Sequence, residues 1–450
     1  MKIDPVRETA LKIIYEINEN NAYSNLALNK GLNNWDLKDI DKAFITEMVY
    51  GVTKWKLALD WTIQQFSNIR LKKMSPWVLN ILRLGTYQIL YMSKVPDSAA
   101  CNESVNLSRK YGHQAASRFI NAVLRNISRN RDNIKYPDEE KELKQYLSVK
   151  YSHPEWLVEH WLEKFGREFT ESFLESNNGI PDLTARVNTL RTTKKELLEL
   201  LKKDGIEAEP GRYLEDAIIF KGQVSVARLE TFKNGFFQVQ DESSMLVGKL
   251  LAPKPGQLVM DVCSAPGGKA THLAQLMNNS GTVIARDIHE HKIKLIEDAA
   301  KRLGIGIIRT ELYDALKFDD NFRMKADRVL VDAPCSGFGI IRRKPDIKWA
   351  KDIEDKREIL KLQRNILAVA AEYVKPGGIL IYSTCTIEDD ENYGMVKEFL
   401  DSTREFVPLD ISDDLPDGLP KTNAKDGFIQ LYPNVEGIDG FFIAKMIRKE

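Results

Sequence analysis

The stretch LVMDVCSAPGGK (residues 258–269) runs from a short apolar segment through a glycine-containing turn into a helical pattern. A near-continuous apolar segment of this length is typical of a strand that is buried on both faces. Gly267 and Gly268 let the backbone of the turn approach a ligand closely, and the following helix presents its N-terminal amides there. The stretch therefore predicts a ligand-binding loop at the carboxyl end of a buried strand.

The alternation of buried strand and helix continues on the C-terminal side of this loop. Strands of this kind are covered by helices on both faces, as in a parallel, doubly wound sheet. We therefore expect a Rossmann-like α/β domain over residues 236–450, with a mostly parallel sheet. Its expected strands are 258–262, 282–288, 305–310, 327–334, 378–384 and 440–446.

Two further regions precede this domain, and a chain of 450 residues is long enough for about three domains. Residues 1–140 show apolar positions three and four apart, which predicts an all-helical domain. Residues 141–235 predict linker helices and a small, βαβ-like accessory module that we expect to bind RNA. Residues 54–135 contain fourteen basic and four acidic side chains, which gives this segment a net charge of +10. This imbalance favours a phosphate-binding face over an ordinary solvated helical surface.

The composition excludes several classes of protein. The 65 basic residues balance the 65 acidic ones, and 43% of the chain is apolar, as in a globular protein. No apolar run approaches the ~20 residues that span a bilayer, so no membrane association is expected. Acidic residues interrupt the first twenty positions, which predicts a cytoplasmic location and reduced thiols. The cysteines show no metal-ligand spacing, so no metal is expected. They are Cys101, Cys263, Cys335 and Cys385.

The loop after the first strand does not fit a phosphate-binding motif. A P-loop would need Gly at the position of Cys263 and Ser or Thr at that of Ala270, which excludes an NTPase, and the dinucleotide glycine spacing is also absent. Asp287, twenty residues beyond Gly267, ends the second strand, where a carboxylate can bind a ribose diol. Asp314 follows the third strand and can reach an adenine amino group. A nucleoside cofactor without a pyrophosphate, namely S-adenosylmethionine, fits this pattern.

Two cysteines follow neighbouring strands: Cys335 lies in DAPCSG (332–337), and Cys385 lies in STCT (383–386). Ligands of open α/β sheets bind at the carboxyl ends of strands, so both thiols should flank one crevice. Thiolate addition at carbon 6 of a pyrimidine makes carbon 5 nucleophilic, and a carboxyl group at ring N3, here Asp332, would stabilise the charge that develops. A second thiol could assist release of the first. These residues alone do not rank the two thiols, and for either one an inert buried thiol is the alternative.

The C-terminal motifs together resemble the NSUN/Fmu (Sun, RsmB) group of RNA cytosine-5 methyltransferases. The helical N-terminus looks like the NusB-type RNA-binding domain of the bacterial 16S ribosomal RNA member of that group. Ser264 replaces a usual Ala, and Asp389 and Asp390 replace a usual Pro-Glu. The motifs that carry the resemblance are FQVQDESS (237–244), CSAPGGK (263–269), Asp287, Asp314, DAPCSG (332–337), RRKPDIKW (342–349) and STCTIEDDEN (383–392).

The resemblance implies roles for individual residues. It implies that Cys385 is the nucleophile and that Cys335 helps to release the enzyme from RNA, with Asp332 and Lys269 completing the catalytic set. The implied phosphate contacts, for which a plain solvated loop is the alternative, are Arg342, Arg343, Lys344 and Lys348. The implied contacts to cofactor or target base are Cys263, Ser264, Ala265, Pro266, Gly267, Gly268, Lys269, Asp287, Asp314 and Asp332.

The sequence thus predicts a class I methyltransferase that uses S-adenosylmethionine to form 5-methylcytosine in 16S ribosomal RNA, either naked or in a partly assembled small subunit. One alternative keeps this chemistry but acts on transfer RNA; the NusB-like region favours the ribosomal target. Another is a non-catalytic RNA-binding factor of ribosome assembly. The paired thiols Cys335 and Cys385 argue against that alternative, because a binding protein does not need them.

Overall fold

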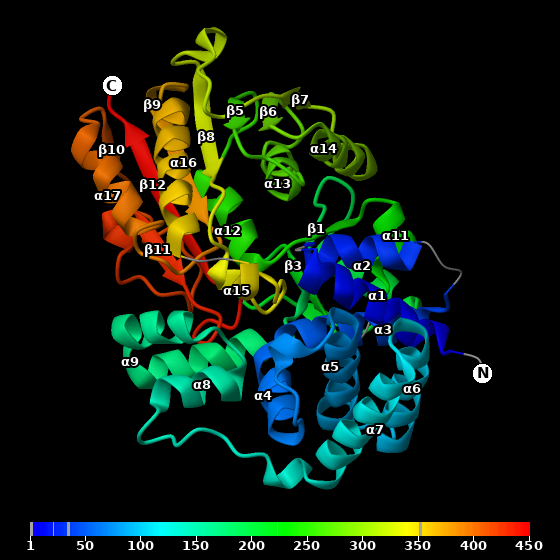
Figure 1. The fold of residues 1–450 in the computed structure, drawn as a ribbon. Helices are drawn as coiled ribbons and strands as arrows, with labels where there is room; N and C mark the ends of the chain where they lie inside the picture. The colour runs from blue at the N-terminus through cyan, green and yellow to red at the C-terminus, as the bar shows by residue number, and fades with distance from the viewer. Residues whose placement is uncertain (1–2, 21, 34–36, 223, 351–352) are drawn as a thin grey trace. The chain divides into compact units, whose positions relative to one another are not determined.

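The structure, a computed structural model, describes residues 3–20, 22–33, 37–222, 224–350 and 353–450 (Figure 1). The chain divides into two compact units. The first comprises Met1–Gly179 with Ile341–Ala350, and the second comprises Ile180–Ile340 with Lys351–Glu450. Within the described residues, no helix is both long and apolar enough to cross a membrane.

The first unit is all-helical, as its 3.6-residue apolar period predicted. Its helices begin at recognisable caps: the Asp4 carboxylate accepts from the Val6 amide, and Ser75 caps a helix that begins with Pro76. The helices are α1 (Pro5–Glu19), α2 (Ser24–Asn33), α3 (Asp39–Lys54), α4 (Lys56–Phe66), α5 (Pro76–Tyr91), α6 (Asp97–Tyr111), α7 (Gln114–Arg129), α8 (Leu143–Tyr151), α9 (Glu155–Asn178) and the short α15 (Ile347–Ala350).

One apolar core holds the N-terminal helices of this unit together. Leu11 of α1, Ile45 of α3, Leu82 of α5 and Ile120 of α7 are each fully buried in it. Cys101 of α6 lies in the same core. The helical region is therefore a domain with its own hydrophobic core.

The helical unit extends beyond the predicted boundary at residue 140. The Ser152 hydroxyl, after α8, accepts from the backbone amide of Leu57 in α4 at 3.0 Å. At the end of α9, the Asn178 carbonyl accepts from the Lys54 ammonium at 2.9 Å. These bonds and the packing of α8 and α9 place residues 143–178 in the helical unit, whereas we expected linker helices of the region 141–235 there.

The segment 341–350 also packs within the helical unit, although in sequence it lies between two strands of the α/β domain. The Trp349 indole donates to the Thr53 carbonyl at 2.7 Å. The Ser24 hydroxyl bonds the buried Asp346 carboxylate. The basic loop that follows Cys335 is therefore anchored to helices α2 and α3.

The second unit begins with the accessory module, a four-stranded sheet in the order β2-β3-β1-β4. The short strand β2 forms a hairpin with β3, so β3 returns antiparallel to β1, and the expected βαβ-like parallel arrangement is wrong. Strand β4 lies beyond the predicted boundary at 235 and pairs with β1. The elements are β1 (Leu183–Val187), α10 (Lys194–Lys203), β2 (Ala208–Pro210), β3 (Ala217–Phe220), α11 (Glu230–Lys233) and β4 (Phe237–Val239).

The main sheet has the order β10-β12-β9-β8-β5-β6-β7, with β11 paired to β12. All neighbours from β9 to β7 are parallel, and β12 is antiparallel to its partners, which confirms the mostly parallel sheet. The expected strand 305–310 lies slightly later, and β10 and β11 were not predicted. The elements are α12 (Glu242–Leu251), β5 (Leu258–Asp261), α13 (Gly268–Leu276), β6 (Thr282–Asp287), α14 (Glu290–Leu303), β7 (Ile308–Leu312), β8 (Ala326–Asp332), α16 (Ile353–Ala371), β9 (Val374–Thr384), α17 (Tyr393–Ser402), β10 (Phe406–Pro408), β11 (Phe428–Leu431) and β12 (Phe441–Arg448).

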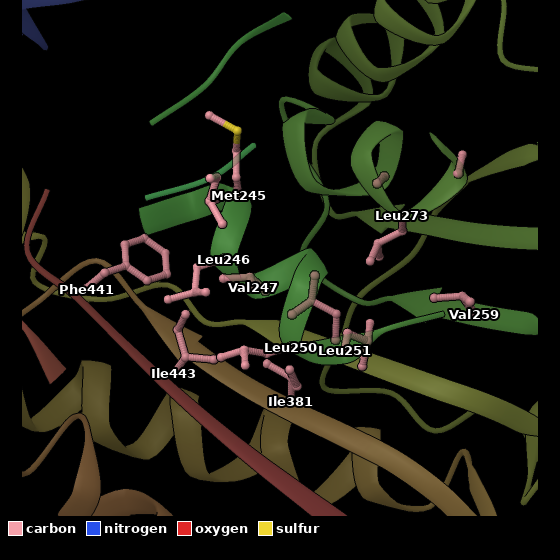
Figure 2. Packing of buried hydrophobic residues seen from close by; sticks show 14 of the residues in the cluster. Met245, Leu246, Val247, Leu250, Leu251, Val259, Leu273, Ile381, Phe441 and Ile443 are labelled. Atoms are coloured by element: carbon pink, nitrogen blue, oxygen red, sulfur yellow. The ribbon is translucent and has the colours of Figure 1, made fainter. Parts of the chain in front are cut away.

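Both faces of the main sheet are buried, because successive side chains of a strand point to opposite faces. On one face, Ile381 of β9 and Ile443 of β12 pack with Leu246 and Leu250 of α12 (Figure 2). On the opposite face, alternate strand residues such as Tyr382 pack with the apolar side of α16 and α17. This two-sided burial explains the near-continuous apolar strands and fixes their carboxyl ends at one edge of the sheet.

Candidate active site

Polar side chains end the parallel strands at the same edge of the sheet. Asp261, Asp287, Asp332 and Thr384 are the last residues of β5, β6, β8 and β9. Because these strands are parallel neighbours, their final residues lie at one edge. The structure thus brings three carboxylates to the place where the sequence predicted a ligand site.

The loop after β5 is shaped by glycine. Gly267 has a φ of 96°, and a Cβ there would lie 3.1 Å from the Cα of Ile296, so this position requires glycine. A Cβ on Gly268 would meet only the Gln240 side chain, at 4.0 Å. The Gly267 amide donates to the Ser264 carbonyl at 2.8 Å, which closes the turn. The loop therefore packs tightly against α14 and leaves space beside Gly268.

Carboxylates surround the Cys263 thiol at the base of this loop. Burial raises its pKa well above the ordinary value, and the nearby carboxylates of Asp261, Asp332 and Asp287 raise it further. The thiol therefore stays protonated, as expected for a loop-shaping residue and not for a third reactive thiol. S-adenosylmethionine carries a sulfonium and an ammonium group, so its positive charges fit this acidic surrounding.

The two acids that the sequence assigned to the nucleoside are held by backbone amides. The Asp287 carboxylate accepts from the His289 amide at 3.0 Å, and Asp287 is 8% exposed. The Asp314 carboxylate, after β7, accepts from the Leu316 amide at 3.0 Å. Each amide engages one carboxylate oxygen, so both side chains are oriented and retain acceptor capacity for a ligand.

Asp261 is a buried acid that the sequence analysis did not single out. Its side chain is nearly fully buried, and neither carboxylate oxygen has a hydrogen-bond partner within ordinary geometry. Burial, followed by the charge of Asp332, raises the pKa of this carboxyl to about 7. The sequence did contain a signal for this residue, because Asp261 interrupts the otherwise apolar run LVMDV (258–262) and Asp is almost never fully buried unless it is paired.

Asp261 should make the stability of the protein depend on pH. The folded protein holds this proton up to about pH 7, whereas an unfolded Asp loses it near pH 4. Raising the pH through this window therefore lowers the free energy of unfolding. We expect the melting temperature of Asp261→Asn, relative to the wild type, to rise by roughly 4 °C or more between pH 5 and pH 8, measured by thermal unfolding without ligand. A melting difference that is the same at both pH values would contradict this, and the exposed Asp401→Asn is the control.

The structure brings the two predicted thiols together. The Sγ atoms of Cys335 and Cys385 are 3.3 Å apart, and both side chains are half-buried. The Gly339 amide donates to the Cys385 carbonyl at 3.0 Å, which ties the two loops. The hydrogen bond with Cys385 raises the pKa of the Cys335 thiol well above its ordinary value, and burial adds to this. Cys335 is therefore a protonated neighbour of Cys385.

Asp332 links this thiol pair to the cofactor loop. One carboxylate oxygen accepts from the Lys269 ammonium at 2.8 Å, and the other accepts from the Ser383 hydroxyl at 2.9 Å. The Lys269 ammonium also lies 5.0 Å from the centre of the Phe441 ring. Lys269 thus holds one oxygen of Asp332, and Ser383 is a contact that the sequence did not predict.

The four predicted phosphate contacts have different environments. Lys344 is exposed, whereas Arg342 and Arg343 are half-buried. Lys348 is completely buried, and burial together with the charge of Lys54 lowers its pKa well below the ordinary value. The assignment of Lys348 as an RNA contact is therefore not supported, because α15 turns this side chain into the helical unit. The pattern of basic residues could not show which of them face solvent.

Three family profiles match the chain. The profile described as 16S rRNA methyltransferase RsmB/F matches residues 248–447, and the NusB family profile matches residues 4–129. The ferredoxin-like domain of RsmF/B-like methyltransferases matches residues 153–227. Fold, loop and profile together define an S-adenosylmethionine-dependent methyltransferase.

Whole-chain relatives make the assignment more specific. The chain is 41% identical to the probable ribosomal RNA small subunit methyltransferase B of Bacillus subtilis over the full length of both proteins. It is 33% identical to ribosomal RNA small subunit methyltransferase B of Proteus mirabilis, over 87% of this chain and 90% of that one. The crystal structure of PH0851 matches all of both chains with a TM-score of 0.83 and 28% identity. The chain belongs to the ribosomal RNA small subunit methyltransferase B family.

A further structure is similar in fold. NSun6 from Pyrococcus horikoshii, solved with SFG, has a TM-score of 0.59 at 23% identity and covers 66% of this chain and 98% of that one.

Among the described residues of this chain, no group of three or more His, Cys, Asp or Glu side chains is arranged to hold a metal ion.

Proposed function

We propose that this protein transfers a methyl group to carbon 5 of a cytosine in 16S ribosomal RNA, through a covalent bond between Cys385 and carbon 6. The observation that carries the proposal is the pair of thiols, Cys335 and Cys385, 3.3 Å apart at the strand ends beside the cofactor loop. Methyl transfer to an oxygen or an exocyclic nitrogen needs no covalent help from the enzyme. Two adjacent, half-buried thiols at the site therefore favour carbon 5 of a pyrimidine as the methyl acceptor.

Cys385 acts first in this reaction. Its thiolate adds to carbon 6 of the cytosine, and the electron pair of the 5,6 double bond makes carbon 5 a nucleophile. The target base must leave its stack to reach the thiol, so a loop or a flipped cytosine is expected as substrate. The bond from sulfur to carbon 6 persists until carbon 5 has lost its proton.

Asp332 stabilises the cytosine ring that Cys385 attacks. A proton held between its carboxyl group and ring N3 would stabilise the negative charge that develops when the thiolate adds. Lys269 and Ser383 hold the two carboxylate oxygens from either side and so limit the orientations of this group. The positive charge of Lys269 adds to the stabilisation of an anionic ring.

S-adenosylmethionine, when bound, supplies the electrophilic methyl group. The loop 263–269 would hold it with backbone groups, Asp287 would accept from the ribose hydroxyls, and Asp314 would accept from the adenine amino group. The carboxylates around Cys263 would match its positive charges. All these residues lie on one unit of the structure.

Cys335 acts last. After methyl transfer, the proton on carbon 5 is removed, the bond between carbon 6 and Cys385 breaks, and the aromatic ring is restored. A thiol within 3.3 Å of the departing sulfur can support this release by hydrogen bonding or proton transfer. The family resemblance assigns this role to the Pro-Cys thiol, and the geometry supports it.

The helical unit supports ribosomal RNA as the substrate. Most of the basic side chains between residues 54 and 135 are exposed, so the positive charge of this region faces solvent. The two relatives described above are named as ribosomal RNA small subunit methyltransferases, and their similarity to this chain includes the helical unit. Either naked RNA or a partly assembled subunit can present such a substrate. The exposed basic residues are Arg70, Lys72, Lys73, Lys94, Arg109, Lys110, Arg118, Arg125, Arg129, Arg131 and Lys135.

The two lysines of the 341–350 segment should differ in their effect on RNA binding. Lys344→Ala removes an exposed charge, so we expect weaker binding of a 16S transcript and a salt slope reduced by about one unit. Lys348→Met removes a buried amine and should leave the salt slope unchanged. Binding isotherms at several salt concentrations measure both slopes. If Lys344→Ala and the wild type have equal salt slopes, Lys344 does not contact the RNA.

Bisulfite sequencing of ribosomal and transfer RNA tests the proposed function. A strain that lacks the gene should lose one 5-methylcytosine from 16S ribosomal RNA, and the wild-type gene should restore it. Loss of a 5-methylcytosine from transfer RNA instead would show that the second substrate class is correct. No change in any cytosine would favour a non-catalytic assembly factor. The cytoplasmic location remains a prediction.

A further inference from the structure

We propose that two adjacent residues, Glu391 and Asn392, set the spacing of the catalytic thiols, with Glu391 holding the Cys335 loop and Asn392 holding the Cys385 loop. Both side chains are buried, with exposed fractions of 0% and 1%. Neither has a role in the chemistry described above, although both belong to the STCTIEDDEN motif (383–392). The inference rests on the proposed function and assigns both as positioning residues.

Glu391 ties together the residues on either side of Cys335. One of its carboxylate oxygens accepts from the Ser336 backbone amide at 2.9 Å and from the Gln363 side-chain amide at 2.9 Å. The same Gln363 nitrogen donates to the Pro334 carbonyl at 2.9 Å. The backbone before and after Cys335 therefore depends on one buried oxygen atom, and its loss would leave a backbone donor unpaired.

Asn392 does the same for Cys385. Its side-chain oxygen accepts from the Thr384 hydroxyl at 2.5 Å, and its nitrogen donates to the Thr386 carbonyl at 3.0 Å. The nitrogen also donates to the Gln430 side chain at 2.7 Å, which anchors the amide to β11. Residues on both sides of the nucleophile are thus bonded to one side chain.

The two clamps are joined in a fixed geometry. Because Glu391 and Asn392 are consecutive, a planar peptide bond sets the distance between them. The Tyr382 hydroxyl donates to the Glu391 carbonyl at 2.8 Å, which anchors the pair to β9. The hydroxyls of Ser336 and Thr386 bond each other at 2.6 Å, so the two loops also meet directly. This arrangement accounts for the close approach of the two sulfur atoms.

Two RNA substrates separate the two clamps experimentally. The first is an unmodified 16S transcript, on which the steady-state fraction of protein bound covalently to RNA reports release. The second is the same transcript containing 5-fluorocytidine, which cannot lose its carbon 5 substituent as a proton, so the rate of covalent trapping reports adduct formation. Both are measured with S-adenosylmethionine on denaturing gels.

We expect Glu391→Ala to impair release. The covalent fraction on unmodified RNA should rise about tenfold, while the trapping rate on fluorinated RNA stays within about twofold of wild type. Asn392→Ala should lower the trapping rate about tenfold, with no rise in covalent fraction on unmodified RNA. A general loss of structure would instead change both measurements in the same direction for both variants.

Matched variants make the test decisive. Glu391→Gln keeps an oxygen acceptor for the Ser336 amide and should restore release, and Glu398→Ala removes an exposed carboxylate of α17 and should behave as wild type. If Glu391→Ala does not fold, Gln363→Met breaks the same clamp and should raise the covalent fraction. Wild-type release in a folded Glu391→Ala, or a release defect in Glu391→Gln equal to that of Glu391→Ala, would overturn the assignment. Absence of any adduct with the wild type on fluorinated RNA would instead refute the proposed function.

Discussion

Cys385→Ala is expected to lower methyl transfer by at least about 10⁴-fold and to prevent formation of a covalent complex with RNA. Without the thiol, carbon 5 of cytosine lacks the electron density that addition at carbon 6 provides. Transfer of a radiolabelled methyl group to a 16S transcript measures the rate, and a denaturing gel detects the complex. Cys101→Ala, which removes a core thiol of the helical unit, is the control that should retain activity.

Full turnover by Cys385→Ala would refute the proposed mechanism. Retention of RNA binding with loss of methyl transfer would agree with it, because Cys385 contributes chemistry and not affinity. The binding measurement also checks that the variant is folded. When the strain that lacks the gene is complemented with a gene for Cys385→Ala, bisulfite sequencing should find the target cytosine still unmethylated.

Cys335→Ala is expected to leave the enzyme covalently attached to its RNA. The nucleophile and the cofactor loop remain, so one methyl group should be transferred per enzyme. Release should then fail, because the departing sulfur has lost the thiol that lies 3.3 Å from it. Turnover should fall about 10²- to 10³-fold, a size typical of the loss of an acid or base. A slowly migrating protein–RNA band on a denaturing gel shows the trapped state.

The double variant Cys335→Ala, Cys385→Ala provides the control for this result. It should give no slowly migrating band, because the bond that is trapped in the single variant is the one from Cys385. A band in the double variant would show that another nucleophile reacts. If Cys335→Ala releases its RNA rapidly, Cys335 takes no part in the release step.

The periodicity of apolar residues predicted much of the fold. Strands β5, β6, β8, β9 and β12 lie where near-continuous apolar runs occur, since a strand covered on both faces has little polar surface to expose. The antiparallel order of the accessory sheet was missed, because β2 is only three residues long and partly polar. Such a strand is specified by its partner β3 and not by its own composition.

The motifs likewise contained most of the chemical groups of the proposed site, but they did not show which buried side chains hold those groups in place. The motifs contained Cys335, Cys385, Asp332 and Lys269, which the structure brings to the strand ends. The contacts of Ser383, like those of Glu391 and Asn392, depend on side-chain directions that sequence spacing does not give. The burial of Lys348 depends on how α15 packs, so a basic pattern could not show it.

The sequence by itself therefore determined the class of fold, the loop 263–269 and the two thiols that we propose to react, because these depend on local periodicity and on residue chemistry. Only the tertiary structure decided how close the thiols lie, which buried groups hold them, and that Asp261 is a buried acid with a raised pKa. Distances and burial arise when β5, β8 and β9, far apart in the chain, become neighbours in one sheet. Long-range pairing of this kind is a property of the folded protein and leaves no local pattern in the chain.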